Sequence, residues 1–121
     1  MDVVEITRLE SGVIKIDYPQ KHITLDIVEE VFKRASSMID GPSPFIISGN
    51  RILYVDYDVL KFTASPEYSD LVSAQAILTR TRVERLLGSL YMKTHPTSYL
   101  NQCFVDETSA LAWLESVNAC A

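Results

Sequence analysis

The sequence predicts an α/β fold in which helices pack on a mostly parallel sheet of about five strands, with one antiparallel hairpin at its edge. Three observations lead to this fold class. Residues 3–18 alternate apolar and polar side chains, the apolar runs at 44–48, 72–78 and 99–105 have the length of strands, and three further segments repeat apolar side chains at helical spacing. Strands that alternate with helices need right-handed crossovers, and such crossovers produce parallel pairing.

The N-terminal hairpin is predicted from two alternating segments, VVEITRLE and VIKIDY, on either side of a turn at residues 10–12. Alternate residues of a strand share a face of the sheet. Val4 with Ile6, and Ile14 with Ile16, are therefore expected on the face that is buried, while the other face stays in water.

The first helix is predicted where the period of the apolar residues changes, from Leu25 onward. Gly41 lies where this helix is expected to stop, because glycine is common just beyond the end of a helix. The predicted buried face consists of Leu25, Val28, Val31, Phe32, Ala35, Met38 and Ile39.

The middle of the chain is predicted as one short strand followed by an irregular segment. PFIIS, residues 44–48, is apolar, β-branched and too short for a helix, which indicates a buried strand. Residues 50–70 are predicted as irregular and helix-leaning. Val59, Leu60 and Phe62 indicate a short helix there, and the segment 65–67 indicates the start of another turn.

The C-terminal half is predicted as two further strand-helix units. The runs VSAQAIL and YLNQCFV are expected to be buried strands, with residues 74–78 and 101–105 at or near the centre of the sheet. Thr81 and Glu84 form a T-x-x-E capping box at the start of the helix predicted at 82–94. The apolar residues of that helix are Val83, Leu86, Leu87, Leu90 and Tyr91.

The last helix is predicted at residues 107–117. Asp106 is expected to cap its N-terminus, because a carboxylate oxygen can accept from the free backbone N–H groups there. Ala110, Trp113, Leu114 and Val117 share one face at helical spacing, so Trp113 is expected to be buried against the sheet rather than to contact a cofactor.

Composition indicates a single domain, residues 1–121, with no linker and no repeat. A net charge of -5 argues against nucleic-acid binding, which needs a basic surface to neutralise phosphates. No window approaches the ~18 consecutive apolar residues of a membrane-spanning helix, and the N-terminus lacks the basic head of a signal peptide. A cytoplasmic protein that does not insert into a membrane is therefore expected.

No catalytic residue, metal site or cofactor is expected. The two cysteines, Cys103 and Cys120, have no metal-ligand spacing. His22 lies in a Pro-Gln-Lys-His turn and His95 precedes a proline, and no nucleophile in an elbow-like context accompanies either of them. The chain is therefore expected not to be an enzyme.

The segments FIIS, AQAILTRTRVERLLGSLYMKTHP and NQCFVDETSALAWLES, in the succession β-β-α-β-α-β-α-β-α, resemble a family of small bacterial proteins. These are the STAS-like or SpoIIAA-like proteins, related to the sporulation anti-sigma-factor antagonist. The resemblance is strongest over residues 72–116 and covers nearly the whole chain at the level of topology. It implies one STAS-like domain with a regulatory, protein-binding function, whose partner is another protein, a second copy of the chain or a small ligand.

One segment departs from the pattern of this family. In the antagonists, an Asp-Ser or Asp-Thr pair at the start of the second helix is phosphorylated to switch partners. The matching segment here is YVDYDVLKF, in which Tyr57 follows Asp56. The resemblance therefore implies a docking module that lacks the usual phosphorylatable hydroxyl.

A cluster of arginines lies where the strand at 72–78 passes into the next helix. Open α/β sheets bind ligands at this carboxyl-end rim, and the free N–H groups of the helix N-terminus favour an anion. Arginine at a helix N-terminus is itself unfavourable, which indicates a negative partner. The candidate ligand or partner rim consists of Arg80, Thr81, Arg82, Asp56, Tyr57 and Asp58.

Two interpretations of this rim stay open at the level of sequence. Acidic residues of the segment 56–70 could satisfy the arginines by ion pairs, or the arginines could bind an anion or a partner. Two functions stay open as well: a docking module, and a carrier of a small or anionic ligand with a pocket between 56–70 and the arginine helix. An exposed apolar patch near Tyr54, Tyr57 and Phe62 would favour docking, and a cavity of ~300 Å³ or more lined by them would favour a ligand.

Overall fold

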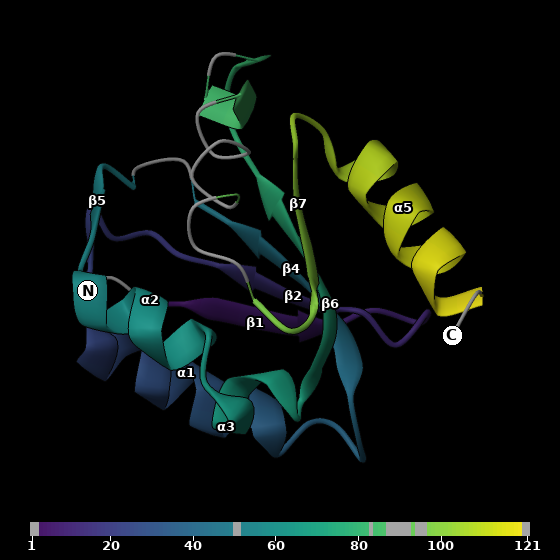
Figure 1. Ribbon diagram of the computed structural model, residues 1–121, viewed down its shortest axis with the longest axis horizontal. Helices are drawn as coiled ribbons and strands as arrows, with labels where there is room; N and C mark the ends of the chain where they lie inside the picture. The colour runs from purple at the N-terminus through teal and green to yellow at the C-terminus, as the bar shows by residue number, and fades with distance from the viewer. Residues whose placement is uncertain (1–2, 50–51, 83, 87–92, 94–96, 120–121) are drawn as a thin grey trace.

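A five-stranded sheet forms the centre of the computed structural model, which describes residues 3–49, 52–82, 84–86, 93 and 97–119 (Figure 1). The strand order is β1-β2-β4-β6-β7. The strands are β1 (Glu5–Arg8), β2 (Ile14–Asp17), β4 (Ser43–Ser48), β6 (Val72–Leu78) and β7 (Leu100–Phe104). β1 pairs antiparallel with β2, and the other neighbours pair in parallel. This arrangement confirms the predicted fold class.

The hairpin between β1 and β2 closes at a glycine, as predicted. Gly12 has φ of 91°, a conformation that other residues rarely adopt. Its N–H donates to the carbonyl of Leu9 at 2.9 Å, and the N–H of Leu9 donates to Val13 at 2.8 Å. The turn sets the register in which Ile6 pairs with Ile16, so the inward side chains of both strands lie on one face.

The first helix, α1 (Leu25–Ser36), begins where Thr24 Oγ1 accepts from the N–H of Ile27. It ends earlier than predicted. The hydroxyls of Ser36 and Ser37 donate to the carbonyls of Lys33 and Arg34 at 2.7 Å, and such bonds compete with a further helical turn. The helix therefore stops well before Gly41, although Val28, Val31, Phe32 and Ala35 form its buried face as predicted.

Helices cover both faces of the sheet (Figure 1). α1, α2 (Tyr57–Thr63) and α3 (Pro66–Ser69) lie on one face, and α5 (Glu107–Ala119) lies on the other. Alternation along the strands divides the core accordingly. Phe45 packs with the α1 side, and its neighbour Ile46 packs with α5. The α5 side of the core consists of Val13, Ile46, Ala74, Ala76, Phe104, Ala110 and Leu114.

Two features of the sheets differ from the sequence prediction. β7 is an edge strand of the five-stranded sheet, so the prediction that residues 101–105 lie at or near its centre was wrong. A second, two-stranded parallel sheet pairs β3 (His22–Ile23) with β5 (Tyr54–Val55). The sequence did not predict this sheet, and it places His22 in a strand rather than in a turn.

The segment after β6 opens with the predicted capping box. The N–H of Glu84 donates to Thr81 Oγ1 at 3.1 Å, and Arg82, Glu84, Arg85 and Leu86 are helical. Leu86, one of the apolar residues at helical spacing, is 61% exposed. The other predicted apolar residues of this helix, Val83, Leu87, Leu90 and Tyr91, lie outside the described residues.

α5 packs on the sheet mainly through Ala110 and Leu114 rather than through Trp113. Ala110 and Leu114 are fully buried, whereas Trp113 is only partly buried and contacts Phe104 with ring centroids 5.4 Å apart. The predicted cap is present, because the N–H of Ser109 donates to Asp106 Oδ1 at 2.7 Å. Trp113 therefore packs against the core on the α5 side of the sheet, but it is only partly buried and not buried as predicted.

Candidate functional site

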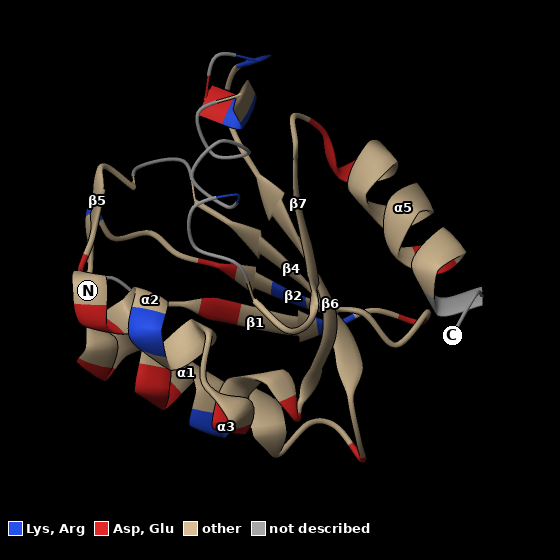
Figure 2. Cartoon of the chain, viewed as in Figure 1, with Lys and Arg blue, Asp and Glu red and all other residues tan. Residues whose placement is uncertain are grey.

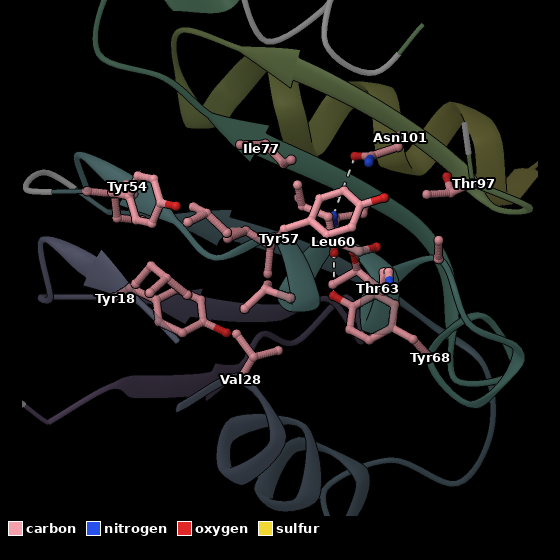
Figure 3. Close-up of a pocket in the computed structure, with 18 of the residues that line it drawn as sticks. Tyr18, Val28, Tyr54, Tyr57, Leu60, Thr63, Tyr68, Ile77, Thr97 and Asn101 are labelled. Carbon is pink, nitrogen blue, oxygen red and sulfur yellow. Dashed lines mark hydrogen bonds between the residues drawn. The ribbon is translucent and has the colours of Figure 1, made fainter. Parts of the chain in front are cut away.

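A cavity of about 700 Å³ lies between the sheet and the segment that contains β5 and α2 (Figure 3). Its volume is within the range of pockets that hold small organic ligands. Most of its described lining is apolar or aromatic: Tyr18, Ile23, Val28, Ile47, Ile52, Leu53, Tyr54, Val55, Tyr57, Val59, Leu60, Ala64, Tyr68 and Ile77. The polar or thiol-bearing part consists of Lys61, Thr63, Gln75, Thr79, Thr97, Asn101 and Cys103.

Three parallel strands supply the floor of the cavity in register. Ile47 of β4 pairs with Ile77 of β6, which pairs with Cys103 of β7. Gln75 and Asn101 form the adjacent pair two residues earlier, and residues two apart on a strand share a face. The sequence alternation of β6 and β7 therefore directs one apolar row and one polar row of side chains into the same cavity.

Exposed apolar side chains surround the mouth of the cavity. Leu53 is 72% exposed, Tyr54 60% and Tyr57 62%. Tyr57 lies in the first turn of α2, where the ammonium group of Lys61 is 5.3 Å from the centre of its ring. Among the described residues, the mouth is therefore aromatic and carries the cation of Lys61.

A hydrogen-bonded chain of three side chains crosses the polar part of the wall (Figure 3). The hydroxyl of Tyr68 donates to Gln75 Oε1, and Gln75 Nε2 donates to Asn101 Oδ1 at 3.5 Å. Tyr68 and Gln75 are each 5% exposed, while Asn101 is partly buried. Burial, with smaller contributions from Tyr99 and Tyr18, raises the pKa of Tyr68 well above its usual value, so the phenol stays neutral and acts as a donor.

Two other groups of the cavity wall, the Tyr18 phenol and the Cys103 thiol, are also held neutral. Desolvation raises the pKa of the Tyr18 phenol and that of the Cys103 thiol. A buried thiol with a raised pKa is a poor nucleophile, because only the thiolate reacts readily. Cys103 is therefore a buried core thiol rather than a nucleophile.

Arg80 of the predicted rim forms an ion pair with a residue that neither sequence interpretation named. Arg80 Nη2 is 2.8 Å from Glu84 Oε2, and the N–H of Arg80 donates to Glu84 Oε1 at 2.9 Å. Arg80 precedes the helix, and a negative partner of its side chain is thus Glu84 in the first turn of that helix. Hydrogen bonds from Arg80 lower the pKa of Glu84, and Figure 2 shows acidic and basic residues next to each other on this short helical stretch. Arg80, Thr81 and Arg82 are exposed.

Asp56 of the predicted rim also has a partner other than the arginines. Asp56 Oδ1 is 2.6 Å from His22 Nε2, and Asp58 is exposed. Of the six predicted rim residues, only Tyr57 is among the residues that line the cavity. The strand-helix junction does reach the cavity, through Thr79, whose hydroxyl donates to the carbonyl of Phe104 at 3.2 Å.

Sequence reasoning missed Tyr68, Gln75 and Asn101. A signal for two of them was present, because Gln75 and Asn101 are polar residues inside runs that were otherwise predicted to be buried strands. Buried amides need hydrogen-bond partners, so such residues indicate a polar network or a ligand contact. The position of Tyr68 depends on α3, which lies in the segment predicted only as irregular.

The described residues contain neither a metal-ligand cluster nor a membrane-spanning helix. No group of three or more His, Cys, Asp or Glu side chains there is placed to hold a metal ion. No helix in the described part of the chain combines the length and the apolar composition that crossing a membrane requires.

Comparisons with known proteins agree with this fold. A crystal structure of an uncharacterized protein of the DUF3478 family with a SpoIIAA-like fold, from Shewanella loihica PV-4, superimposes with a TM-score of 0.65. It is 16% identical, and the match covers 93% of this chain and 92% of that one. The SpoIIAA-like fold that the sequence resemblance implied is thus confirmed. No curated protein matches the chain. A family model matches residues 7–118, and the chain therefore belongs to the family described as Domain of unknown function (DUF7793).

Proposed function

We propose that this protein is a binding module that holds one small, largely apolar molecule in the cavity between the sheet and α2. The observation that carries this proposal is the cavity itself, about 700 Å³ with aromatic and aliphatic walls and a few polar groups. Such a combination is typical of small-molecule sites, in which apolar walls supply affinity and a few polar groups fix the orientation. The volume exceeds the ~300 Å³ that separates a ligand site from a filled core.

The chemistry of the wall supports binding rather than catalysis. Tyr18, Tyr68 and Cys103 have raised pKa values because they are buried, so they stay protonated near neutral pH. A general base or a nucleophile has to reach its reactive form near the working pH. These groups supply hydrogen bonds and apolar surface instead.

Binding of Nile red, a neutral apolar dye, tests the proposal. The dye should gain fluorescence on the wild-type protein, and Ile77→Trp, which fills the floor of the cavity, should weaken binding about tenfold or more. Ser73→Trp is the matched control, because Ser73 is exposed on the same strand and does not line the cavity. Ala64→Trp blocks the same space from an exposed position and serves if Ile77→Trp does not fold. Equal binding by the wild type and the folded blocking variants would contradict the proposal.

Native mass spectrometry of the purified protein complements the dye experiment. A molecule that copurifies with the wild type and is missing from Ile77→Trp would identify the occupant directly. The same spectra report whether the chain is a monomer or a dimer.

A second candidate function is protein docking, which the exposed residues Leu53, Tyr54 and Tyr57 favour. Apolar side chains that gather on a surface mark contact sites more often than isolated ones do. In this alternative, a second copy of the chain covers the mouth of the cavity. Light scattering across a concentration series should then show a dimer that Tyr57→Asp dissociates. Leu86→Asp is the control, since Leu86 is another exposed apolar residue, and a monomer at every concentration would exclude self-association.

A further inference from the structure

We propose that the ligand of this cavity carries a hydrogen-bond acceptor oxygen, as a carbonyl or a carboxylate, which binds the side-chain amide of Asn101. Its flat apolar body extends toward Tyr18 and Tyr54. This inference rests on the proposed binding function and assigns the chemical class of the ligand.

The direction of the hydrogen-bonded chain determines what Asn101 presents to the cavity. The Tyr68 phenol is neutral and buried, and it donates its one hydrogen to Gln75 Oε1. The amide nitrogen of Gln75 then faces Asn101 and donates to its oxygen. With its oxygen engaged in this way, Asn101 presents its Nδ2 hydrogens to the cavity.

The threonine hydroxyls of the wall already use their hydrogens on the backbone. Thr63 Oγ1 donates to Leu60 at 3.2 Å, Thr97 Oγ1 donates to Tyr99 at 2.8 Å, and Thr79 Oγ1 donates to Phe104. The amide hydrogens of Asn101 therefore remain for a ligand, whereas the hydrogens of these threonine hydroxyls do not. An orphaned N–H is costlier than an under-used oxygen, so the wall demands an acceptor more strongly than a donor.

The charge of the described lining fits the same class. Lys61 is its one formally charged side chain, and no Asp or Glu is among the described residues that line the cavity. A carboxylate in the cavity would meet a cation and amide donors, whereas an ammonium group would meet the Lys61 charge. The exclusion of cations follows from Coulomb repulsion as well as from hydrogen bonding.

The cavity is polarised from one end to the other, which orients the ligand. Figure 3 shows Asn101 and Thr97 at one end and Tyr18 and Tyr54 at the other. Aromatic rings pack favourably against flat ring systems by stacked or edge-on contacts. A molecule with a ring system and a terminal carbonyl or carboxylate therefore matches both ends at once.

Three probes with a common ring separate the chemical classes: 2-naphthoate, 2-naphthamide and 2-naphthylmethylamine. The first two present an acceptor oxygen, and the third presents a cationic donor at neutral pH. Displacement of Nile red should show the naphthoate and the naphthamide binding about tenfold or more tightly than the amine. Equal affinity for all three, or a preference for the amine, would overturn the inference.

Asn101→Asp tests the assigned atom, because it replaces the amide donor with an anionic acceptor of nearly the same shape. Binding of 2-naphthoate should fall about tenfold or more, and Asn101→Ala should reduce binding of both acceptor probes. Gln102→Glu is the matched control, since it adds one negative charge at the next residue of β7, which is exposed and outside the cavity lining. Unchanged naphthoate binding in Asn101→Asp would overturn the inference.

Binding of Nile red separates failure of the acceptor inference from failure of the proposed binding function. If the dye binds and Ile77→Trp blocks it while the probes show no preference for acceptors, the acceptor inference fails and the binding function stands. If neither the dye nor any probe binds, both fail.

Discussion

His22 Nε2 lies 2.6 Å from Asp56 Oδ1, and this contact joins β3 to the residue that precedes α2. Three backbone bonds accompany it: Leu53 and Tyr54 donate to the carbonyl of Lys21, and Asp56 donates to that of Ile23 at 3.0 Å. The edge of the ring of His22 also contacts Tyr54, with ring centroids 5.1 Å apart. The mouth of the cavity is therefore attached to β3 by a small and local set of interactions.

Asp56→Asn should loosen this attachment without unfolding the protein. The side chains of the His22–Asp56 pair are 55% and 32% exposed, so the pair stabilises the fold by at most about 1 kcal/mol. Few contacts hold the segment around β5 against β3, so losing one of them should make local opening more frequent. Amide exchange at Tyr54 and Asp56 should therefore accelerate several-fold. Asp58→Asn, an exposed change two residues away, is the control. Equal exchange in both variants would show that the contact does not hold the mouth in place.

The sequence predicted the elements whose pattern is periodic over several residues, such as the hairpin, the buried face of α1 and the strand at 44–48. The pair β3 and β5 could not be predicted in this way, because a two-residue ladder contains no period. It forms because the segment before α1 contacts the segment before α2, and these segments are far apart in the sequence. Residues 50–70 lacked a pattern for the same reason.

Glu84 shows which negative partner of Arg80 the sequence analysis did not consider. Glu84 was recognised as part of a capping box, yet the search for a negative charge turned to the distant segment 56–70. Arg80 precedes the predicted capping box by one residue, and a side chain there is within reach of the first helical turn whatever the tertiary fold, so Glu84 was a local candidate. The cavity itself depends on how α2 packs over β6, which no local pattern specifies.

Gly49→Ala should destabilise the fold and disturb the cavity. A Cβ at Gly49 would lie 2.9 Å from the backbone oxygen of Tyr18 and would also press on the side chain of Ile52. Both neighbours line the cavity, and the backbone oxygen cannot move without straining the bond from the Tyr18 N–H to Ser48. We expect a loss of about 1–3 kcal/mol in urea denaturation. Gly41→Ala is the control, because no atom lies within 4 Å of a Cβ there; equal effects of the two changes would refute the steric argument.

Leu114→Ala should destabilise the protein more than Trp113→Ala does. Leu114 is fully buried between α5 and the sheet, and its truncation should cost about 2–5 kcal/mol, since a cavity is left behind. Trp113 is partly buried and loses its contact with Phe104, so we expect a smaller loss, about 1–3 kcal/mol. Chemical denaturation of both variants measures the difference. A larger loss for Trp113→Ala would mean that the tryptophan, and not Leu114, anchors α5.

The cap of α5 should make stability depend on pH in the acid range. Hydrogen bonds from the N–H and the hydroxyl of Ser109 lower the pKa of Asp106. The folded state therefore binds the proton less readily than the unfolded state does. The stabilisation by Asp106 is fully present above the unfolded pKa of about 3.9 and is lost as the pH falls through the lower folded pKa.

Two substitutions at Asp106 separate its charge from its hydrogen bond. Asparagine caps helices about as well as aspartate but has no charge, whereas alanine can do neither. At neutral pH the melting temperature should therefore fall slightly in Asp106→Asn and further in Asp106→Ala. As the pH is lowered below about 4, the wild type should lose its advantage over Asp106→Asn, because its carboxylate becomes protonated. Asp40→Asn, an exposed change after α1, controls for the general effect of removing one negative charge. An advantage of the wild type over Asp106→Asn that stays constant from neutral pH down to pH ~2 would show that the ionised carboxylate is not what stabilises the start of α5.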